Sequence, residues 1–164
     1  MRMTNRRALA VALGLASLCT STVAEQLPKS GIIKVHTGFK VSPDVTEVGE
    51  KRMQGHGSSV GVSFNDSGSG PLHAGPISCF WAFFASDNSS KVKGYCAFGD
   101  ADSDRLYTDW SGASSGSEGT AGRMEIVGGT GKYSGIQGDG QFKCQMVGPN
   151  GQETCMAQLN YRLP

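Results

Sequence analysis

The side chain in this sequence with the clearest capacity for acid–base chemistry is His56, because an imidazole titrates closest to neutral pH. Gln54 and Arg52 precede His56 by two and four residues. Residues two apart lie on the same face of a β-strand, so the three side chains would share one face. The same phase continues into three apolar residues that we expect to face inward: Val60, Val62 and Phe64. We therefore expect Arg52, Gln54 and His56 to bind and orient a ligand, with His56 as the candidate catalytic acid or base.

A second polar pair consists of Tyr107 and Asp109, which alternate along another predicted strand. Both would reach a cavity if this side of the strand faced inward, so they are candidate ligand-binding residues. The opposite side carries three residues that compete for the inward position: Leu106, Thr108 and Trp110. The other two histidines are expected to be solvated, because His36 alternates with lysines and His73 lies in a loop rich in Gly and Pro.

Metal-binding chemistry is not predicted. The run Asp100-x-Asp102-x-Asp104 lacks the glycine and the terminal glutamate of an EF-hand loop, so we expect a solvated turn there. The cysteines that follow residue 25 do not form the close Cys-x-x-Cys pairs that zinc sites use. No nucleophile–base triad or paired carboxylates stand out, and the sequence predicts no metal and no cofactor.

An even number of cysteines remains after residue 25, which in an exported protein predicts two disulfides. They are Cys79, Cys96, Cys144 and Cys155. The midpoint of the first two falls within residues 86–90 and that of the last two within residues 148–151, and both segments consist of turn-forming residues. If each turn closes a hairpin, the two cysteines that flank it lie opposite each other on neighbouring strands. We therefore predict the disulfides Cys79–Cys96 and Cys144–Cys155.

Eight short segments alternate, or run apolar, between turn-forming residues, as β-strands do. They are Gly31–Val41, Lys51–Phe64, Ile77–Phe84, Val92–Gly99, Arg105–Ser111, Gly122–Val127, Gln137–Met146 and Thr154–Leu163. Their links are short, which favours sequential antiparallel pairing, and eight such strands can close without an exposed edge. The sequence thus predicts an all-β fold, an eight-stranded antiparallel β-barrel, with a two-sheet sandwich as the alternative. The longest link, residues 65–76, is expected to be a surface loop.

The third predicted strand is apolar on both faces over residues 79–84. One face of each strand in a simple barrel should be exposed to solvent and polar. An apolar outer face therefore indicates that another segment or another chain covers it. Two explanations stand equal: a homo-oligomer (a dimer or a trimer), or a covering loop or tail of the same chain.

Residues 124–142 form the most distinctive segment of the chain. It is not a phosphate-binding loop, because Tyr133 follows Lys132 where Ser or Thr is required. Gly-Gly-Thr-Gly at 128–131, the aromatic Tyr133, small residues and Gly-x-Gly at 138–140 make a glycine-dependent corner between two strands. This corner resembles one shared by allene oxide cyclases and dirigent proteins. The resemblance implies an eight-stranded antiparallel barrel, often trimeric, with a mostly apolar cavity that steers reactive small molecules by placement.

The N-terminus is typical of a secretory signal peptide, with arginines, then a short apolar run, then small residues ending at Ala24. A buried N-terminal helix and lipid attachment at Cys19 fit less well, and Leu18 stands where lipid attachment requires a small residue. We expect residues 1–24 to be a leader, residues 25–164 to be one domain, and the protein to be secreted or periplasmic. The 15 Lys and Arg, less the leader's three arginines, leave 12 against 14 Asp and Glu. This balance predicts neither nucleic-acid binding nor membrane attachment after cleavage.

Two classes of function are consistent with these features. The first is a barrel that binds an apolar small molecule in its lumen and acts as a cyclase or isomerase by positioning it. The second is a non-catalytic exported protein: a binding protein, an inhibitor of a secreted enzyme or a structural component.

Overall fold

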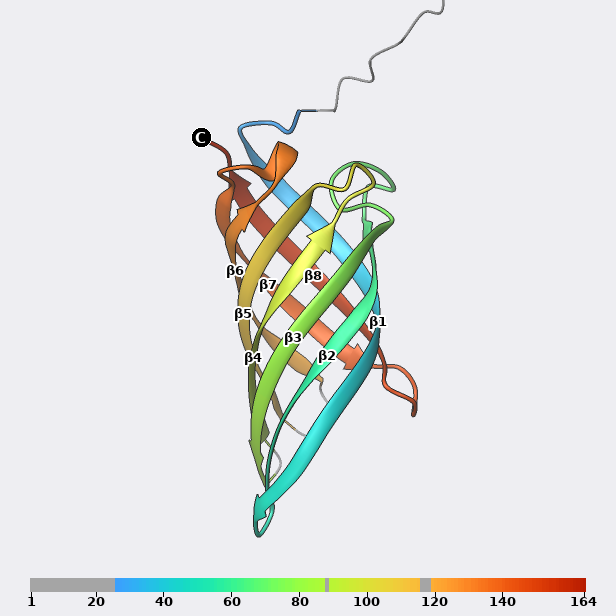
Figure 1. Ribbon diagram of the computed structural model, residues 1–164, viewed down its shortest axis with the longest axis vertical. Helices are drawn as coiled ribbons and strands as arrows, with labels where there is room; N and C mark the ends of the chain where they lie inside the picture. Colours follow the sequence, from blue (N-terminus) through green and yellow to red (C-terminus); the bar gives the residue numbers. More distant parts are fainter. Residues whose placement is uncertain (1–25, 88, 116–118) are drawn as a thin grey trace, which may run out of the picture.

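The computed structural model of this chain describes residues 26–87, 89–115 and 119–164. The predicted leader, residues 1–24, lies outside the described residues. The chain forms eight strands and one short 3₁₀ helix: β1 (Ser30–Gly49), β2 (Arg52–Asn65), β3 (Gly75–Ser86), β4 (Ser89–Gly99), β5 (Arg105–Ser115), β6 (Thr120–Gly129), η1 (Gly131–Tyr133), β7 (Gln137–Met146) and β8 (Gln152–Arg162). Each strand pairs antiparallel with the next, and β8 pairs with β1 to close the barrel (Figure 1). The predicted barrel is confirmed.

Both predicted disulfides are confirmed as well. Cys79 of β3 lies directly opposite Cys96 of β4, and Cys144 of β7 lies directly opposite Cys155 of β8. Each bond therefore joins two neighbouring strands of one hairpin. Disulfides of this kind persist in oxidising compartments, which agrees with an exported protein. Among the described residues, no helix has the length and apolar character needed to cross a membrane.

The first hairpin is longer than the sequence predicts, because β1 continues past Val41 to Gly49. Beyond Lys40, β1 no longer pairs with β8 but keeps its register with β2, from Ser42 opposite Ser58 onward. Pro43 is tolerated in this part because the strand has become an edge strand, where a missing N–H need not break a ladder.

The two faces of β2 are the reverse of those predicted. Ser59 and Ser63 are buried, whereas the apolar residues of the alternate phase are exposed. Those exposed residues are Val60, Val62 and Phe64. The inward positions of β2 hold small residues because large side chains of neighbouring strands fill the space beside them. The apolar phase of β2 therefore marks the outside of the barrel.

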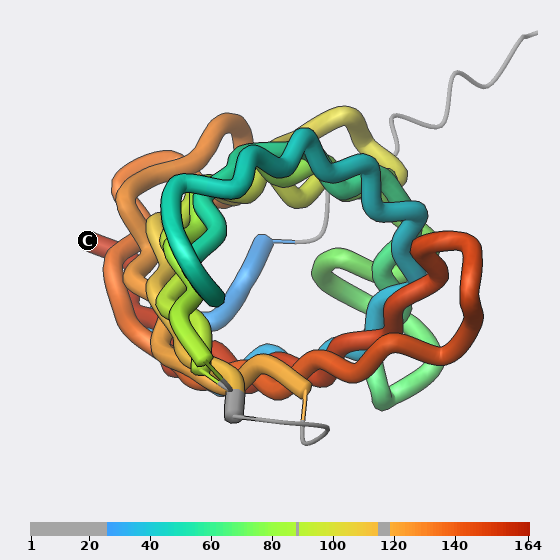
Figure 2. Tube along the Cα trace, turned by 90° about the horizontal axis from the view of Figure 1, so that it is seen from below, coloured from blue at the N-terminus to red at the C-terminus, as the bar shows by residue number. Residues whose placement is uncertain are grey.

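One end of the barrel is closed by the link between β2 and β3. Leu72 in this link is fully buried, so the predicted surface loop is in part a plug, and Figure 2 shows this loop, in green, reaching inside the ring of strands. The Ser63 hydroxyl donates a hydrogen bond to the Leu72 carbonyl at 2.8 Å. The buried apolar core of the barrel includes Ile33, Val35, Ile77, Phe98, Leu106, Ile126, Ile136 and Leu159.

The predicted turn at residues 100–104 is present and its residues 101–103 are exposed, but Asp100 is buried and its carboxylate is fully engaged. It accepts hydrogen bonds from the Tyr133 hydroxyl at 2.5 Å and from the Leu72 N–H at 3.2 Å. Lys132 pairs with Asp100 at 3.1 Å and with Asp102 at 2.9 Å. Asp100 thus connects the glycine-rich corner, through Lys132 and Tyr133, to Leu72 of the plug. The predicted corner between two strands is present and contains η1.

Candidate functional site

The lumen of the barrel contains a cavity of about 260 Å³ that is partly open to solvent. Its walls are mostly apolar and rich in aromatic rings, all on inward positions of the strands: Phe39, Trp81, Phe83, Trp110 and Phe142. Both disulfides line the same cavity. This volume lies just below the range of about 300–1,000 Å³ that is common for small-molecule sites. The lumen is therefore suited to a small and largely apolar ligand.

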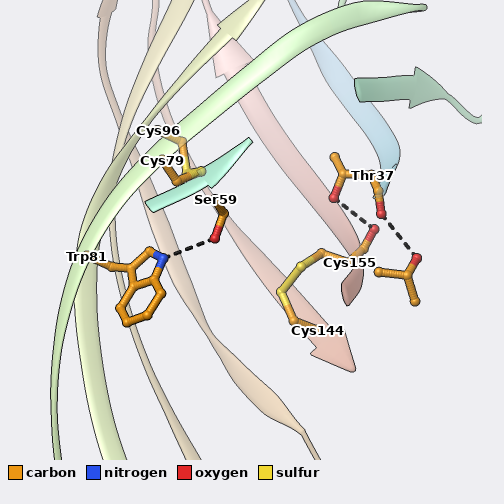
Figure 3. Close-up of a disulfide and its surroundings, with 8 residues drawn as sticks. Thr37, Ser59, Cys79, Trp81, Cys96, Cys144 and Cys155 are labelled. Carbon is orange, nitrogen blue, oxygen red and sulfur yellow. Dashed lines mark hydrogen bonds between the residues drawn. A yellow bond between two sulfur atoms is a disulfide. The ribbon is translucent and has the colours of Figure 1, made fainter. Parts of the chain in front are cut away.

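Residues on neighbouring strands contact the two indole rings of the lumen. The Trp81 Nε1–H donates a hydrogen bond to the Ser59 hydroxyl at 3.0 Å, beside the Cys79–Cys96 disulfide (Figure 3). Trp110 packs edge-to-face on Phe142, with ring centroids 5.4 Å apart. The buried Trp110 Nε1–H has no hydrogen-bond acceptor among the described residues. A buried donor without an acceptor costs free energy.

Glu153 supplies the ionisable group of the lumen. It is the one residue with an ionisable side chain among the described residues that line the cavity. It lies opposite Phe39 on β1 and opposite Met146 on β7, and neither neighbour can compensate a charge. Burial raises the pKa of the Glu153 carboxyl above its ordinary value. The lumen can thus present a carboxylic acid that stays protonated at a higher pH than a surface glutamate does.

The polar cluster that the sequence predicts in the lumen lies elsewhere. Arg52, Gln54 and His56 are exposed on the outer face of the β1–β2 hairpin, because the phase of β2 is the reverse of that predicted. None of the three lines the cavity. His56 therefore faces no lumen ligand, and its predicted place as the catalytic acid or base of the cavity is corrected.

Tyr107 and Asp109 also lie outside the cavity. They are half-buried on the outer face of β5, while Leu106 and Thr108 are fully buried on the inner face. The inner face of β5 is therefore formed by Leu106, Thr108 and Trp110, which were the alternative to Tyr107 and Asp109. Of the other histidines, His36 is exposed and lies 3.0 Å from the Asp66 carboxylate, as expected for a surface residue. His73 is half-buried rather than solvated.

The residues that do line the cavity could have been found from the disulfides. Cross-strand bonding of Cys79 to Cys96 and of Cys144 to Cys155 fixes the phase of four strands. Stepping by two residues from Cys79 reaches Trp81, and stepping back by two from Cys155 reaches Glu153. If the disulfides are placed inside the barrel, the side chains of Trp81 and Glu153 are predicted to point inward as well.

The outer face of β2 and β3 carries exposed apolar side chains. On β3, Phe80 is 70% exposed and Phe84 is 48% exposed. The patch continues onto the neighbouring strands with Val60, Val62 and Phe64 of β2 and Tyr95 of β4. We call these six residues the outer patch. The expected apolar outer face of the third strand is present, and no loop or tail among the described residues covers it.

No protein-family model matches this chain, and the search of curated proteins found no significant match.

Proposed function

We propose that this protein is a secreted or periplasmic barrel that binds an apolar small molecule in its lumen. The observation that carries the proposal is the aromatic-walled cavity, in which Glu153 is the one ionisable side chain among the described lining residues. Apolar walls with a few convergent polar groups are the usual composition of small-molecule sites. A ligand that fits is an apolar molecule with one hydrogen-bond acceptor, such as a carbonyl or epoxide oxygen.

Catalysis by placement is the extension that Glu153 supports. A carboxylic acid with a raised pKa inside an apolar cavity can donate a proton to a bound oxygen while rigid walls restrict the conformations of the substrate. This chemistry fits a cyclase or isomerase, which is also what the resemblance of residues 128–140 implies. The site requires no cofactor for this step.

The outer patch favours the second class of function, a binding or structural role through the surface. Exposed apolar patches of several large side chains commonly mark protein contacts. Within the proposal, the outer patch is the contact between copies of the chain in a dimer or trimer.

A dye-displacement screen tests the proposal directly. The purified, oxidised protein is loaded with a hydrophobic fluorescent dye and challenged with apolar compounds of different shapes. Ala157 lines the lumen, whereas its neighbour Met156 lies on the outer face of the same strand. Ala157→Phe should fill the cavity and weaken binding at least tenfold, and Met156→Phe should change it less than twofold. Displacement by no compound, or unchanged binding in Ala157→Phe, would overturn the proposal.

A further inference from the structure

The Cys144–Cys155 disulfide has a carboxyl group beside it inside the lumen. The two sulfur atoms and a carboxylate oxygen of Glu153 all lie within 4.8 Å of one another. Glu153 precedes Cys155 by two residues on β8, so both side chains point into the barrel. A small molecule that enters the cavity therefore reaches the disulfide and the carboxyl group together.

The other disulfide lies in the same cavity but has no acid beside it. Cys79–Cys96 also joins directly opposed residues and also lines the cavity. Its lumen neighbours are Ser59, opposite Cys79, and Trp81, two residues along β3. Among the described residues, no second group of His, Cys, Asp or Glu side chains comes as close together as Cys144, Glu153 and Cys155. The chain thus contains a matched pair of lumen disulfides that differ in a neighbouring carboxyl group.

The charge of Glu153 is not compensated by neighbouring strands. The residues that face it from β1 and β7 are Phe39 and Met146. The lysines of β1 and β7 that are nearest in sequence to Phe39 and Met146 are Lys40 and Lys143. Both are exposed on the outer face of the barrel. Burial raises the pKa of Glu153, and no described hydrogen bond or ion pair opposes this effect. The neutral acid is therefore the form that the lumen favours.

We propose that Cys144–Cys155 is a thiol–disulfide exchange site, in which the Glu153 carboxylic acid protonates the departing cysteine sulfur. The reacting partner is a small thiol that fits the lumen. This inference goes beyond the proposed function and does not require that the lumen bind an apolar ligand, so the two can fail separately.

The step balances with a dithiol as the reductant. A thiolate of the dithiol attacks one sulfur of the disulfide, and a bond forms between them while the Cys144–Cys155 bond breaks. The electron pair of the broken bond goes to the other cysteine sulfur, which takes the proton of Glu153. The second thiol of the reductant then loses its proton to water and attacks its own partner sulfur in the mixed disulfide. A bond forms between the two sulfurs of the reductant while the bond to the cysteine breaks, and the departing cysteine sulfur takes a proton from water, so that the cysteine pair is reduced and the dithiol is oxidised. The Glu153 carboxylate is reprotonated from water.

The test measures both disulfides in the same tube. Folded protein is treated with dithiothreitol between pH 5 and 8, samples are alkylated over time, and the fraction of each reduced pair is measured by peptide mass spectrometry. The rate for Cys79–Cys96 corrects for the changing thiolate concentration. The ratio of the Cys144–Cys155 rate to the Cys79–Cys96 rate should fall about tenfold as pH rises and Glu153 ionises, because a carboxylate donates no proton and repels the thiolate.

Three variants distinguish proton donation by Glu153 from a structural effect of its side chain. Glu153→Gln should give a ratio that stays constant within about twofold across the range, and Glu153→Asp should restore part of the dependence on pH. Adding Gln152→Glu to Glu153→Gln puts a carboxyl group on the outer face of the same strand and should restore nothing. A pH-independent ratio in the natural protein, or an unchanged pH dependence in Glu153→Gln, overturns the proposal.

Discussion

The indole ring of Trp81 lies directly over Gly57 on the neighbouring strand. A Cβ atom added to Gly57 would stand 2.6 Å from two ring carbons of Trp81 and 2.5 Å from the carbonyl oxygen of Ser42. The ring therefore packs where any other residue would place a side chain. The same relationship joins Gly55 to Phe83 on the same pair of strands. Glycine on the inner face of β2 is what allows large aromatic rings to form the cavity wall.

Replacing Gly57 by Ala should destabilise the barrel by about 1–3 kcal/mol, because the added methyl group must displace the Trp81 ring or the β1 backbone. The measurement is the free energy of unfolding in urea with both disulfides intact. Gly38→Ala is the matched control, because a Cβ atom at Gly38 meets nothing within 4 Å. We expect it to change stability by less than about 0.5 kcal/mol. Equal effects of the two substitutions would contradict this account of the cavity wall.

The fold could be predicted from the sequence because turns, strand spacing and cysteine positions all agree on it. The faces of β2 could not be predicted in the same way. Val60, Val62 and Phe64 are the most apolar residues of this strand, and the general expectation is that apolar residues face inward. Here the inner space is filled from β3, so the inward residues of β2 are small. Alternation reveals two faces, but which face is inward depends on the size of side chains on other strands.

The carboxylate of Asp100 should make stability depend on acid pH. Burial alone would raise the pKa of Asp100, but hydrogen bonds from Tyr133, the Leu72 N–H and Lys132 outweigh it and hold the pKa below its ordinary value. The resulting stabilisation is complete above the unfolded pKa near 4 and is lost as pH falls through the lower folded value. Asp100→Asn should therefore be less stable than the natural protein at pH 6, and the difference should shrink toward pH 2. Urea unfolding curves between these limits provide the measurement, and a difference that stays constant would contradict the assignment.

Removing the Tyr133 hydroxyl tests the same contact from the other partner. Tyr133→Phe takes away one donor to Asp100 while the ring stays packed, and it should cost about 1–3 kcal/mol of stability at pH 6. The natural protein's dependence on acid pH should weaken in this variant, because one cause of the lowered pKa is gone. A loss of stability that is the same at pH 2 and pH 6 would show that the hydroxyl acts through packing alone.

Glu153 should have the opposite dependence on pH. Its pKa is raised by burial in the folded protein, so ionisation above the unfolded value of about 4.5 costs stability. Glu153→Gln should equal the natural protein near pH 4 and should be more stable than it at pH 8. The measurement is the unfolding free energy of both proteins across this range. Greater stability of the natural protein at pH 8 would mean that the carboxylate has a favourable partner in the lumen.

The outer patch should hold copies of the chain together. Phe80 is its most exposed member, and Phe80→Ser should shift the protein toward the monomer in size-exclusion chromatography with light scattering. Val147, which is 62% exposed in the link between β7 and β8, provides the control, because these two strands do not pair with β2, β3 or β4. Val147→Ser should leave the elution unchanged. Monomeric elution of the natural protein at every concentration would remove the interface explanation of the patch.

The candidate site was less accessible to sequence reasoning than the fold. Histidine and arginine draw attention as chemical groups, but His56 and Arg52 belong to the solvated face of a long hairpin. Glu153 is not predicted from the sequence, because a single glutamate between Gln152 and Thr154 has no motif around it. Its role follows from the apolar surroundings that raise its pKa, and those surroundings come from β1, β7 and the barrel interior. A site made by burial is assembled by the fold and leaves little trace in local sequence.

The central claim is that ligands bind inside the barrel rather than on the outer patch. Both tryptophans of the chain line the lumen, while Phe80 and Tyr95 mark the outside. The most direct measurement is the intermolecular nuclear Overhauser effect between the protein and a bound apolar compound from the displacement screen. The lumen account predicts cross-peaks from the compound to the indole protons of Trp81 and Trp110. Cross-peaks to the rings of Phe80 and Tyr95, with none to the indoles, would contradict it.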